Sequence, residues 1–215
     1  IATDAWSPQV NGVVRTLTAL IGELRQRGHH VIPVTPEGRR SLPLPFYTEI
    51  GLTRVTAREI GREIDVARPD AIHIVTEGPI GWAARKACLR RGLPFTTAFH
   101  TRFAEYAAAR LPVPGVKQLG WLILRHFHKP SNAVMVPTQR VADELAGWGF
   151  RNLKVWTRGV DRSLFRPYGE DVLGYPRPIL LYAGRLAIEK GIEDFLRLDM
   201  PGTKVLVGDG PERSV

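Results

Sequence analysis

A glycine-bounded turn late in the chain carries the residue types best suited to chemistry. Arg185 and Lys190 lie in it and Gly184 opens it, after an apolar run at 179–183 and before a helical pattern at 192–196. Backbone N–H groups at the start of a helix favour an anion, and the two cations add full charges. Arginine binds phosphate oxygens through forked hydrogen bonds, whereas lysine acts as a point charge. The turn therefore predicts a phosphate or diphosphate site; the alternative is two solvated cations in an ordinary loop.

Two other glycine-containing segments follow predicted strands. Asn11 is an N-cap candidate for the first helical pattern, and Gly12 beside it lets a ligand approach the backbone. Gly208, Asp209 and Gly210 close a later strand, where their backbone N–H groups could reach a ligand. Neither segment has the Gly-x-Gly-x-x-Gly spacing of a dinucleotide site, which disfavours a nicotinamide or flavin enzyme.

Polar side chains also follow two strands in the middle of the chain. Glu77 comes after the apolar run at 71–75, and His100 and Arg102 come after the run at 95–99. Ligands of open parallel sheets bind at the edge where the strands end, so a functional role for His100 competes with a structural one. The histidines lack acidic or cysteine partners at metal-ligand spacing, and we expect no metal site.

Apolar runs and helical patterns alternate along the chain, and the candidate residues lie at their ends. Such alternation predicts an α/β fold whose parallel sheet is covered on both faces. The expected strands are 31–34, 71–75, 95–99, 133–136, 153–156, 179–183 and 204–207, and the start at 1–3 looks like the end of a truncated first strand. The expected helices are 12–27, 58–67, 80–91, 116–128 and 139–146.

A proline-containing segment at 159–178 interrupts this rhythm. It indicates a first Rossmann-like domain at 1–160 and a linker at 161–177, and residues 178–215 are then the start of a second Rossmann-like domain. About 40 residues rarely make a stable domain without disulfides or metals. We therefore expect the second domain to be incomplete in this chain.

The formal net charge of +9 calls for an anionic partner, either nucleic acid, a membrane surface or a small substrate. No zinc-finger, helix-turn-helix or RNA-binding signature is present, so nucleic acid is the weakest of the three. The single cysteine, Cys88, is typical of a reducing cytoplasm. No apolar run is long enough to span a membrane.

One segment joins basic and apolar residues in a way that suits an anionic lipid surface. Residues 39–47 read RRSLPLPFY, and Arg54 and Arg58 follow them. Such a segment could rest on a membrane. The alternative, a solvated proline-rich loop that packs on its own domain, is slightly favoured.

Six segments, spread over the whole chain, resemble the motifs of one family. They are TDAWSPQVNGV at 3–13, TEGPIG at 76–81, FHTRF at 99–103, RGVD at 158–161, GRLAIEK at 184–190 and VGDGP at 207–211. Together they resemble the retaining glycosyltransferases of family 4, which have the GT-B architecture of two Rossmann-like domains. Bacterial enzymes that transfer mannose from GDP-mannose to lipid-like acceptors are the most similar subgroup. Sulfoquinovosyl and glucosyl lipid synthases are similar too.

The resemblance implies roles for the residues above. The Gly12 backbone would approach the donor diphosphate, and Arg185 and Lys190 would hold it and stabilise it as it leaves. His100 would contact the donor sugar near the reacting carbon. The remaining donor-binding candidates are Gly184, Gly208, Asp209 and Gly210, and the acceptor-side candidates are Glu77 and Arg102. Two glutamates eight positions apart, also typical of the family, are absent from these residues.

The implied reaction is transfer of a hexose, with retention and without a metal or cofactor, from a nucleotide sugar to a lipid or glycan acceptor. It implies a cytoplasmic protein, with peripheral contact at the inner face of the membrane as a further expectation. This chain alone is expected to be inactive. The alternatives are a UDP-sugar-dependent glycolipid synthase, a non-catalytic nucleotide-sugar-binding fragment and a basic nucleic-acid-binding domain.

Overall fold

The computed structural model describes residues 1–9, 11–44, 47–100, 102–110, 113–167, 169 and 173–214. It forms two compact units, Ile1–Gly159 and Val160–Val215, which are described one at a time. Val10 and Thr101 of the quoted motifs, Pro45 and Phe46 of the basic segment, and 168 and 170–172 of the expected linker lie outside the described residues.

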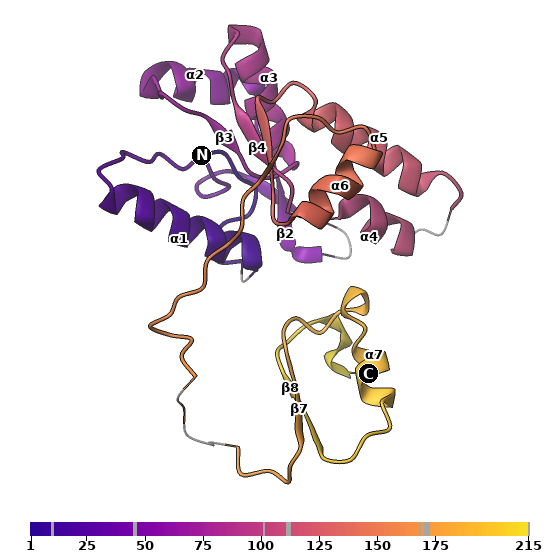
Figure 1. The fold of residues 1–215 in the computed structure, drawn as a ribbon. Coiled ribbons are helices and arrows are strands. Elements are labelled where there is room, and N and C mark those ends of the chain that lie inside the picture. The colour runs from indigo at the N-terminus through magenta and orange to yellow at the C-terminus, as the bar shows by residue number, and fades with distance from the viewer. Residues whose placement is uncertain are drawn as a thin grey trace. The chain divides into compact units, whose positions relative to one another are not determined.

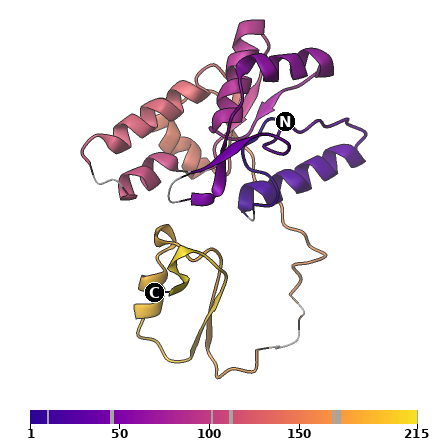
Figure 2. The ribbon, with the colours of Figure 1, turned by 180° about the vertical axis from the view of Figure 1, so that it is seen from behind.

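The first unit is built on a parallel sheet. Its strands β3 (His73–Ile74), β4 (Thr96–Ala98), β5 (Ala133–Val136) and β6 (Leu153–Val155) are hydrogen-bonded in that order. Ala2 forms parallel bridges with both Ile74 and Val34, so the N-terminal residues lie beside β3 (Figures 1 and 2). The expected strand at 31–34 is reduced to the single bridge at Val34.

Six helices are described in this unit: α1 (Gly12–Gln26), α2 (Ala57–Ala67), α3 (Pro79–Arg91), α4 (Phe103–Arg110), α5 (Val116–His128) and α6 (Gln139–Gly147). Helix α2 packs against α3, and α4 against α5, as Figures 1 and 2 show. Two buried apolar clusters hold the sheet to these helices. Ile60, Ile74, Ile80 and Phe127 belong to the first. The second contains Phe99, Trp121, Leu124, Val134 and Leu145.

The helices begin where their sequences supply caps. The Asn11 side chain accepts hydrogen bonds from the N–H groups of Val13 and Val14, both at 3.0 Å, so the expected N-cap of α1 is confirmed. Thr56 and Glu59 form a reciprocal capping box at the start of α2. Local polar residues therefore fix the two helix starts.

Two parts of the first unit differ from the sequence expectations. Part of the segment at 39–47, interpreted as a loop, is strand: its residues 41–44 form β1 (Ser41–Leu44), and 47 begins β2 (Tyr47–Thr53), which pairs with β1 antiparallel, so the loop interpretation is wrong for these residues. Pro43 is tolerated because it lies in a two-stranded ribbon with an open edge. Helix α4 was not expected from the pattern, because eight residues give only about two turns of periodicity.

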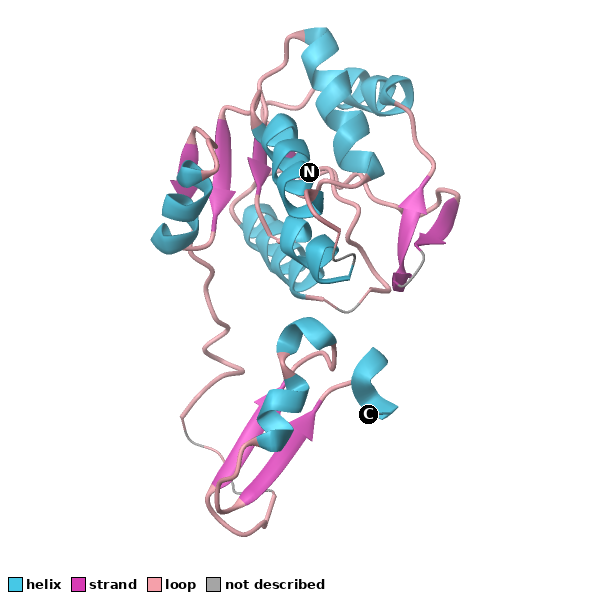
Figure 3. Ribbon diagram, turned by 90° about the vertical axis from the view of Figure 1, so that its right-hand side faces the viewer, coloured by secondary structure: helices cyan, strands magenta, loops and turns pink. Residues whose placement is uncertain are grey.

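The second unit contains two parallel strands, β7 (Ile179–Ala183) and β8 (Thr203–Val207), which lie side by side in Figure 3. Helix α7 (Ile192–Arg197) connects them. Short 3-10 turns, η1 (Ile188–Lys190) and η2 (Pro211–Ser214), precede α7 and follow β8. The β7–α7–β8 order is the expected strand–helix–strand unit.

Candidate functional site

His100 lies just beyond β4, at the carboxyl edge of the first unit's sheet. Its Nδ1 is hydrogen-bonded to a guanidinium N–H of Arg158, which follows β6. Its Nε2 is buried and has no hydrogen-bond partner among the described residues. Burial, and after it the nearby Arg158 charge, lowers the pKa of His100 to about 4. The imidazole is therefore neutral at physiological pH.

Glu77 belongs to a separate buried polar chain. Its Oε1 lies 3.2 Å from Nε2 of His128, and the two side chains are 7% and 1% exposed. On the other side of the ring, Nδ1 of His128 lies 2.8 Å from Oγ1 of Thr97, which donates to Ser131. The carboxylate of Glu77 is thus committed to an interior partner. Its acceptor-side role stays a prediction.

Asp4 was assigned no role from the sequence motifs, and the structure places it at the start of α3. Its buried carboxylate accepts hydrogen bonds from the Ile80 and Gly81 N–H groups, at 2.8 and 3.2 Å, and from the Thr76 hydroxyl at 2.8 Å. The helix needs this cap because its own N-cap, Gly78, has no side chain. Burial raises the pKa of Asp4.

Gly78 keeps the approach of Asp4 open, since a Cβ there would lie 2.4 Å from the carboxylate carbon. A sequence signal for this contact did exist. Asp4 directly follows the first strand segment, and the Gly78–Pro79 helix start carries no capping side chain of its own. What the sequence did not show was that the two segments meet.

Gly12 is the first residue of α1, and the space in front of it is open. A Cβ built at Gly12 meets no other atom within 4 Å. The open space is compatible with a ligand that touches the backbone, and the donor-contact role of Gly12 stays a prediction.

Arg102 is held between two carboxylates. Its guanidinium lies 2.6 Å from Glu144 and 3.1 Å from Glu105. The hydrogen bonds to Glu105 are the first cause that raises the pKa of Arg102. The pairing offsets its charge, so Arg102 adds little attraction for an anionic ligand. Its acceptor-side role also stays a prediction.

In the second unit, the two glycine segments pack backbone against backbone. The Gly184 N–H donates to the Val207 carbonyl and the Leu186 N–H to the Asp209 carbonyl, both at 2.9 Å. A Cβ at Gly208 would lie 1.8 Å from the Gly184 carbonyl oxygen, and one at Gly210 would lie 2.1 Å from that of Leu186. These two glycines are therefore required for loop packing, whatever else they do.

Arg185 and Lys190 lie on the β7–α7 connection. The Tyr182 hydroxyl donates to the Arg185 carbonyl at 2.7 Å, and Lys190 is exposed at the end of the 3-10 turn. Gly191, with a φ of 63°, then separates Lys190 from α7. The 3-10 turn Ile188–Lys190 thus lies within the glycine-bounded turn that the sequence predicted between the strand and the helix.

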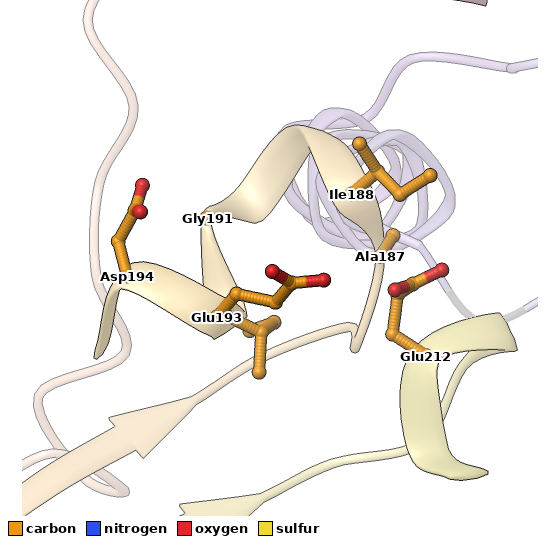
Figure 4. Close-up of a pocket in the computed structure, with 7 residues that line it drawn as sticks. Ala187, Ile188, Gly191, Glu193, Asp194 and Glu212 are labelled. Carbon is orange, nitrogen blue, oxygen red and sulfur yellow. The ribbon is translucent and has the colours of Figure 1, made fainter. Parts of the chain in front are cut away.

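A cavity of about 240 Å³ lies beside this connection. Its lining is Ala187, Ile188, Gly191, Ile192, Glu193, Asp194 and Glu212, most of which are labelled in Figure 4. The lining contains three carboxylates and neither predicted cation, so the cavity does not suit a diphosphate. A diphosphate bound by the two predicted cations would lie elsewhere on the connection.

Within the part of the chain that the structure describes, no group of three or more His, Cys, Asp or Glu side chains could hold a metal ion. None of the described helices combines the length and apolar character needed to cross a bilayer.

The fold and the polar edge of the sheet define a Rossmann-like α/β protein, in agreement with the predicted fold class. The model of Glycosyltransferase Family 4 matches residues 10–164, and the chain belongs to that family. The resemblance seen in the sequence motifs is thereby confirmed.

Relatives with assigned names align over almost all of this chain. A GDP-mannose-dependent alpha-mannosyltransferase of Mycobacterium tuberculosis is 27% identical over 100% of the chain and 63% of its own length. A sulfoquinovosyl transferase of Arabidopsis thaliana is 27% identical over 94% of the chain and 45% of its own length. An alpha-monoglucosyldiacylglycerol synthase of Acholeplasma laidlawii is 22% identical over 100% of the chain and 64% of its own length. The chain thus spans less than two thirds of these relatives.

Proposed function

We propose that the whole protein transfers a hexose from a nucleotide sugar to a lipid or glycan acceptor, with retention of configuration. The observation that carries the proposal is the position of Gly12 and His100. Both follow strand segments of one parallel sheet, within the residues that match the family. GDP-mannose is the first candidate donor, because mannosyltransferases named for it are 25–28% identical to this chain.

In this proposal residues 1–160 form the acceptor-side domain, 161–177 a linker and 178–215 the start of the donor domain. Arg185 and Lys190 stabilise the negative charge that grows on the diphosphate as it leaves. Preorganised donors of this kind are each worth about 3 kcal/mol of transition-state stabilisation. Protein cations then take the place of a metal ion, so we propose that transfer needs none.

The acceptor proposal includes peripheral contact with an anionic membrane on the cytoplasmic side. The hairpin offers Leu42, which is 73% exposed, but Arg39, which precedes the hairpin, is already paired with Glu63 at 2.5 Å. Helix α5 offers a second surface. Its Leu119, Leu122 and Ile123 are 57%, 53% and 48% exposed.

No acidic residue lies on α5, and the exposed cations Arg125 and Lys129 stand at its C-terminal end. An apolar stripe beside cations suits an anionic bilayer. Sedimentation of the full-length protein with phosphatidylglycerol vesicles separates the two surfaces. We expect Leu122→Glu to weaken binding and Leu42→Glu to leave it nearly unchanged; the reverse order would assign the contact to the hairpin.

The test of the activity is a donor screen. Full-length protein is incubated with GDP-mannose and with UDP-sugars, and glycosyl transfer or donor hydrolysis is measured with and without a chelator. Arg185→Ala and Lys190→Ala should each lower turnover about 100-fold. Use of UDP-sugars alone would favour the glycolipid-synthase alternative. Donor binding without turnover would favour a non-catalytic module.

A further inference from the structure

We infer that Arg158 is a positioning residue: it holds the His100 imidazole as the tautomer whose proton lies on Nε2, so that Nε2 donates a hydrogen bond to an oxygen of the bound ligand. The inference rests on the proposed function for the identity of that ligand, an uncharged sugar oxygen of the donor. The Arg158–His100 contact itself does not depend on it.

The chemistry of the two groups fixes the tautomer. A guanidinium carries only N–H donors and no acceptor. The ring nitrogen that faces Arg158 must therefore accept, which requires it to be unprotonated. A neutral imidazole carries a single N–H, so the proton lies on the other nitrogen. In the observed ring orientation that nitrogen is Nε2, because Nδ1 faces Arg158.

The other nitrogen is the one that needs a partner. Nε2 of His100 is buried without a hydrogen-bond partner among the described residues. A buried donor left unpaired costs about 1–3 kcal/mol. A hydroxyl oxygen of a bound sugar would satisfy that donor.

Burial is the first cause that keeps the His100 ring neutral, and the charges around it act in the same direction. The groups that act on it are Arg158 after β6, His73 on β3 and His128 at the end of α5. Of these groups Arg158 is always charged and opposes a second proton on the ring, whereas a histidine does so only when it is itself protonated. Arg158 has a further effect, since a doubly protonated ring could no longer accept its hydrogen bond. Arg158 therefore sets the tautomer of His100 and adds to the effect of burial, which is the larger cause of the neutral state.

The test uses the full-length protein and three variants. Arg158→Met removes the donor, Arg158→Lys retains a cationic donor, and His100→Gln keeps an N–H donor on a side chain that cannot titrate. Arg151→Met, an exposed arginine just before β6, is the matched control. Nitrogen NMR of the imidazole reports the tautomer and the pKa of His100 without any substrate.

We expect wild-type His100 to carry its proton on Nε2 and to stay neutral into acid. In Arg158→Met its pKa should rise, with Arg158→Lys close to wild type and Arg151→Met unchanged. The activity should change in the same order. In Arg158→Met we expect kcat/KM to be about tenfold lower, and the acid limb of its pH profile, the fall of kcat/KM in acid, to move to higher pH. A merely structural loss would lower turnover without moving that limb.

A double-mutant cycle tests whether Arg158 acts through His100. In a His100→Gln background, Arg158→Met should lower kcat/KM by less than about twofold. A full tenfold loss in that background overturns the inference, and so does a wild-type ring protonated on the nitrogen that faces Arg158. If no nucleotide sugar is used by the protein, the proposed function fails, while the NMR comparison still decides the tautomer. If Arg158→Met does not fold, nitrogen NMR of the wild-type imidazole still decides the tautomer, and His100→Gln, which cannot titrate, still shows whether the loss of turnover in acid belongs to His100.

Discussion

Gly208 and Gly12 look alike in the sequence, as glycines beside a ligand, but the structure assigns them different mechanical roles. A Cβ at Gly208 would lie 1.8 Å from the Gly184 carbonyl oxygen, whereas one at Gly12 meets no atom within 4 Å. We predict that Gly208→Ala destabilises the second unit, and that Gly12→Ala leaves the fold intact and weakens donor binding.

The expected size of the Gly208→Ala effect follows from the contacts it breaks. The two backbones must separate by more than an ångström, because real Cβ atoms essentially never approach within 3.0 Å. Overpacking of this kind costs about 1–3 kcal/mol. The separation also strains the hydrogen bonds from Gly184 to Val207 and from Leu186 to Asp209, each worth about 1 kcal/mol. We expect a total loss of about 3 kcal/mol.

The assay must resolve the two units. All five tryptophans lie in the first unit, so their fluorescence does not report on the second. Amide hydrogen exchange of β7 and β8 in the full-length protein does, with β4 and β5 as the internal reference. Gly208→Ala should speed exchange in β7 and β8 only, by about 100-fold if these strands exchange through local opening.

Donor binding gives the complementary readout. For Gly12→Ala we expect unchanged exchange and a dissociation constant for the nucleotide sugar about tenfold higher, because the new methyl group would take the space in which we propose that the diphosphate binds. Gly22→Ala, in the same helix and equally open, should change neither property. Unchanged exchange in Gly208→Ala, together with weaker donor binding, would refute the packing argument and make this glycine a ligand contact.

Two further predictions concern the first unit, and tryptophan fluorescence during urea unfolding checks both. Gly81→Ala should cost about 2–4 kcal/mol, because its Cβ would lie 1.8 Å from the Thr76 carbonyl oxygen, whereas Gly22→Ala should be neutral or stabilising; equal effects would contradict this. Burial lowers the pKa of His73 to about 4, so the unfolded chain binds the proton first and stability falls as pH drops from about 6.5 towards 4. His73→Gln should remove about 3 kcal/mol of this decrease in the free energy of unfolding. An unchanged pH dependence would contradict the assignment of the decrease to His73.

Local signals in the sequence were enough for much of the fold. The bounds expected for the helix at 116–128 and the strands at 133–136 and 179–183 match α5, β5 and β7. Each has a strong period or an uninterrupted apolar run, and both signals come from residues close together in the chain. The hairpin was not predicted because Pro43 weakened the strand signal of its first strand. Helix α4 was not predicted because it is short.

The contacts that build the candidate site are of another kind. Arg158 meets His100 across 58 residues, and Asp4 reaches the start of α3 across 76. Arg158 and Asp4 both belong to motifs that were recognised. Their partners could not be inferred, because the pairing depends on strand order and no local pattern encodes strand order. The sequence therefore indicated which edge of the sheet is polar, and the structure was needed to pair the residues there.

The place of Ala2 between Val34 and Ile74 also bears on how the first unit folds. The earliest residues of the chain enter the sheet only after a partner more than 70 positions later has been made. Closing such a loop is entropically slow, and folds rich in distant pairings form more slowly than those built from neighbours. We therefore expect the pairing of the first strand and the Asp4 cap to form in the rate-limiting step of folding. Destabilising substitutions at Asp4 would then slow folding more than they speed unfolding.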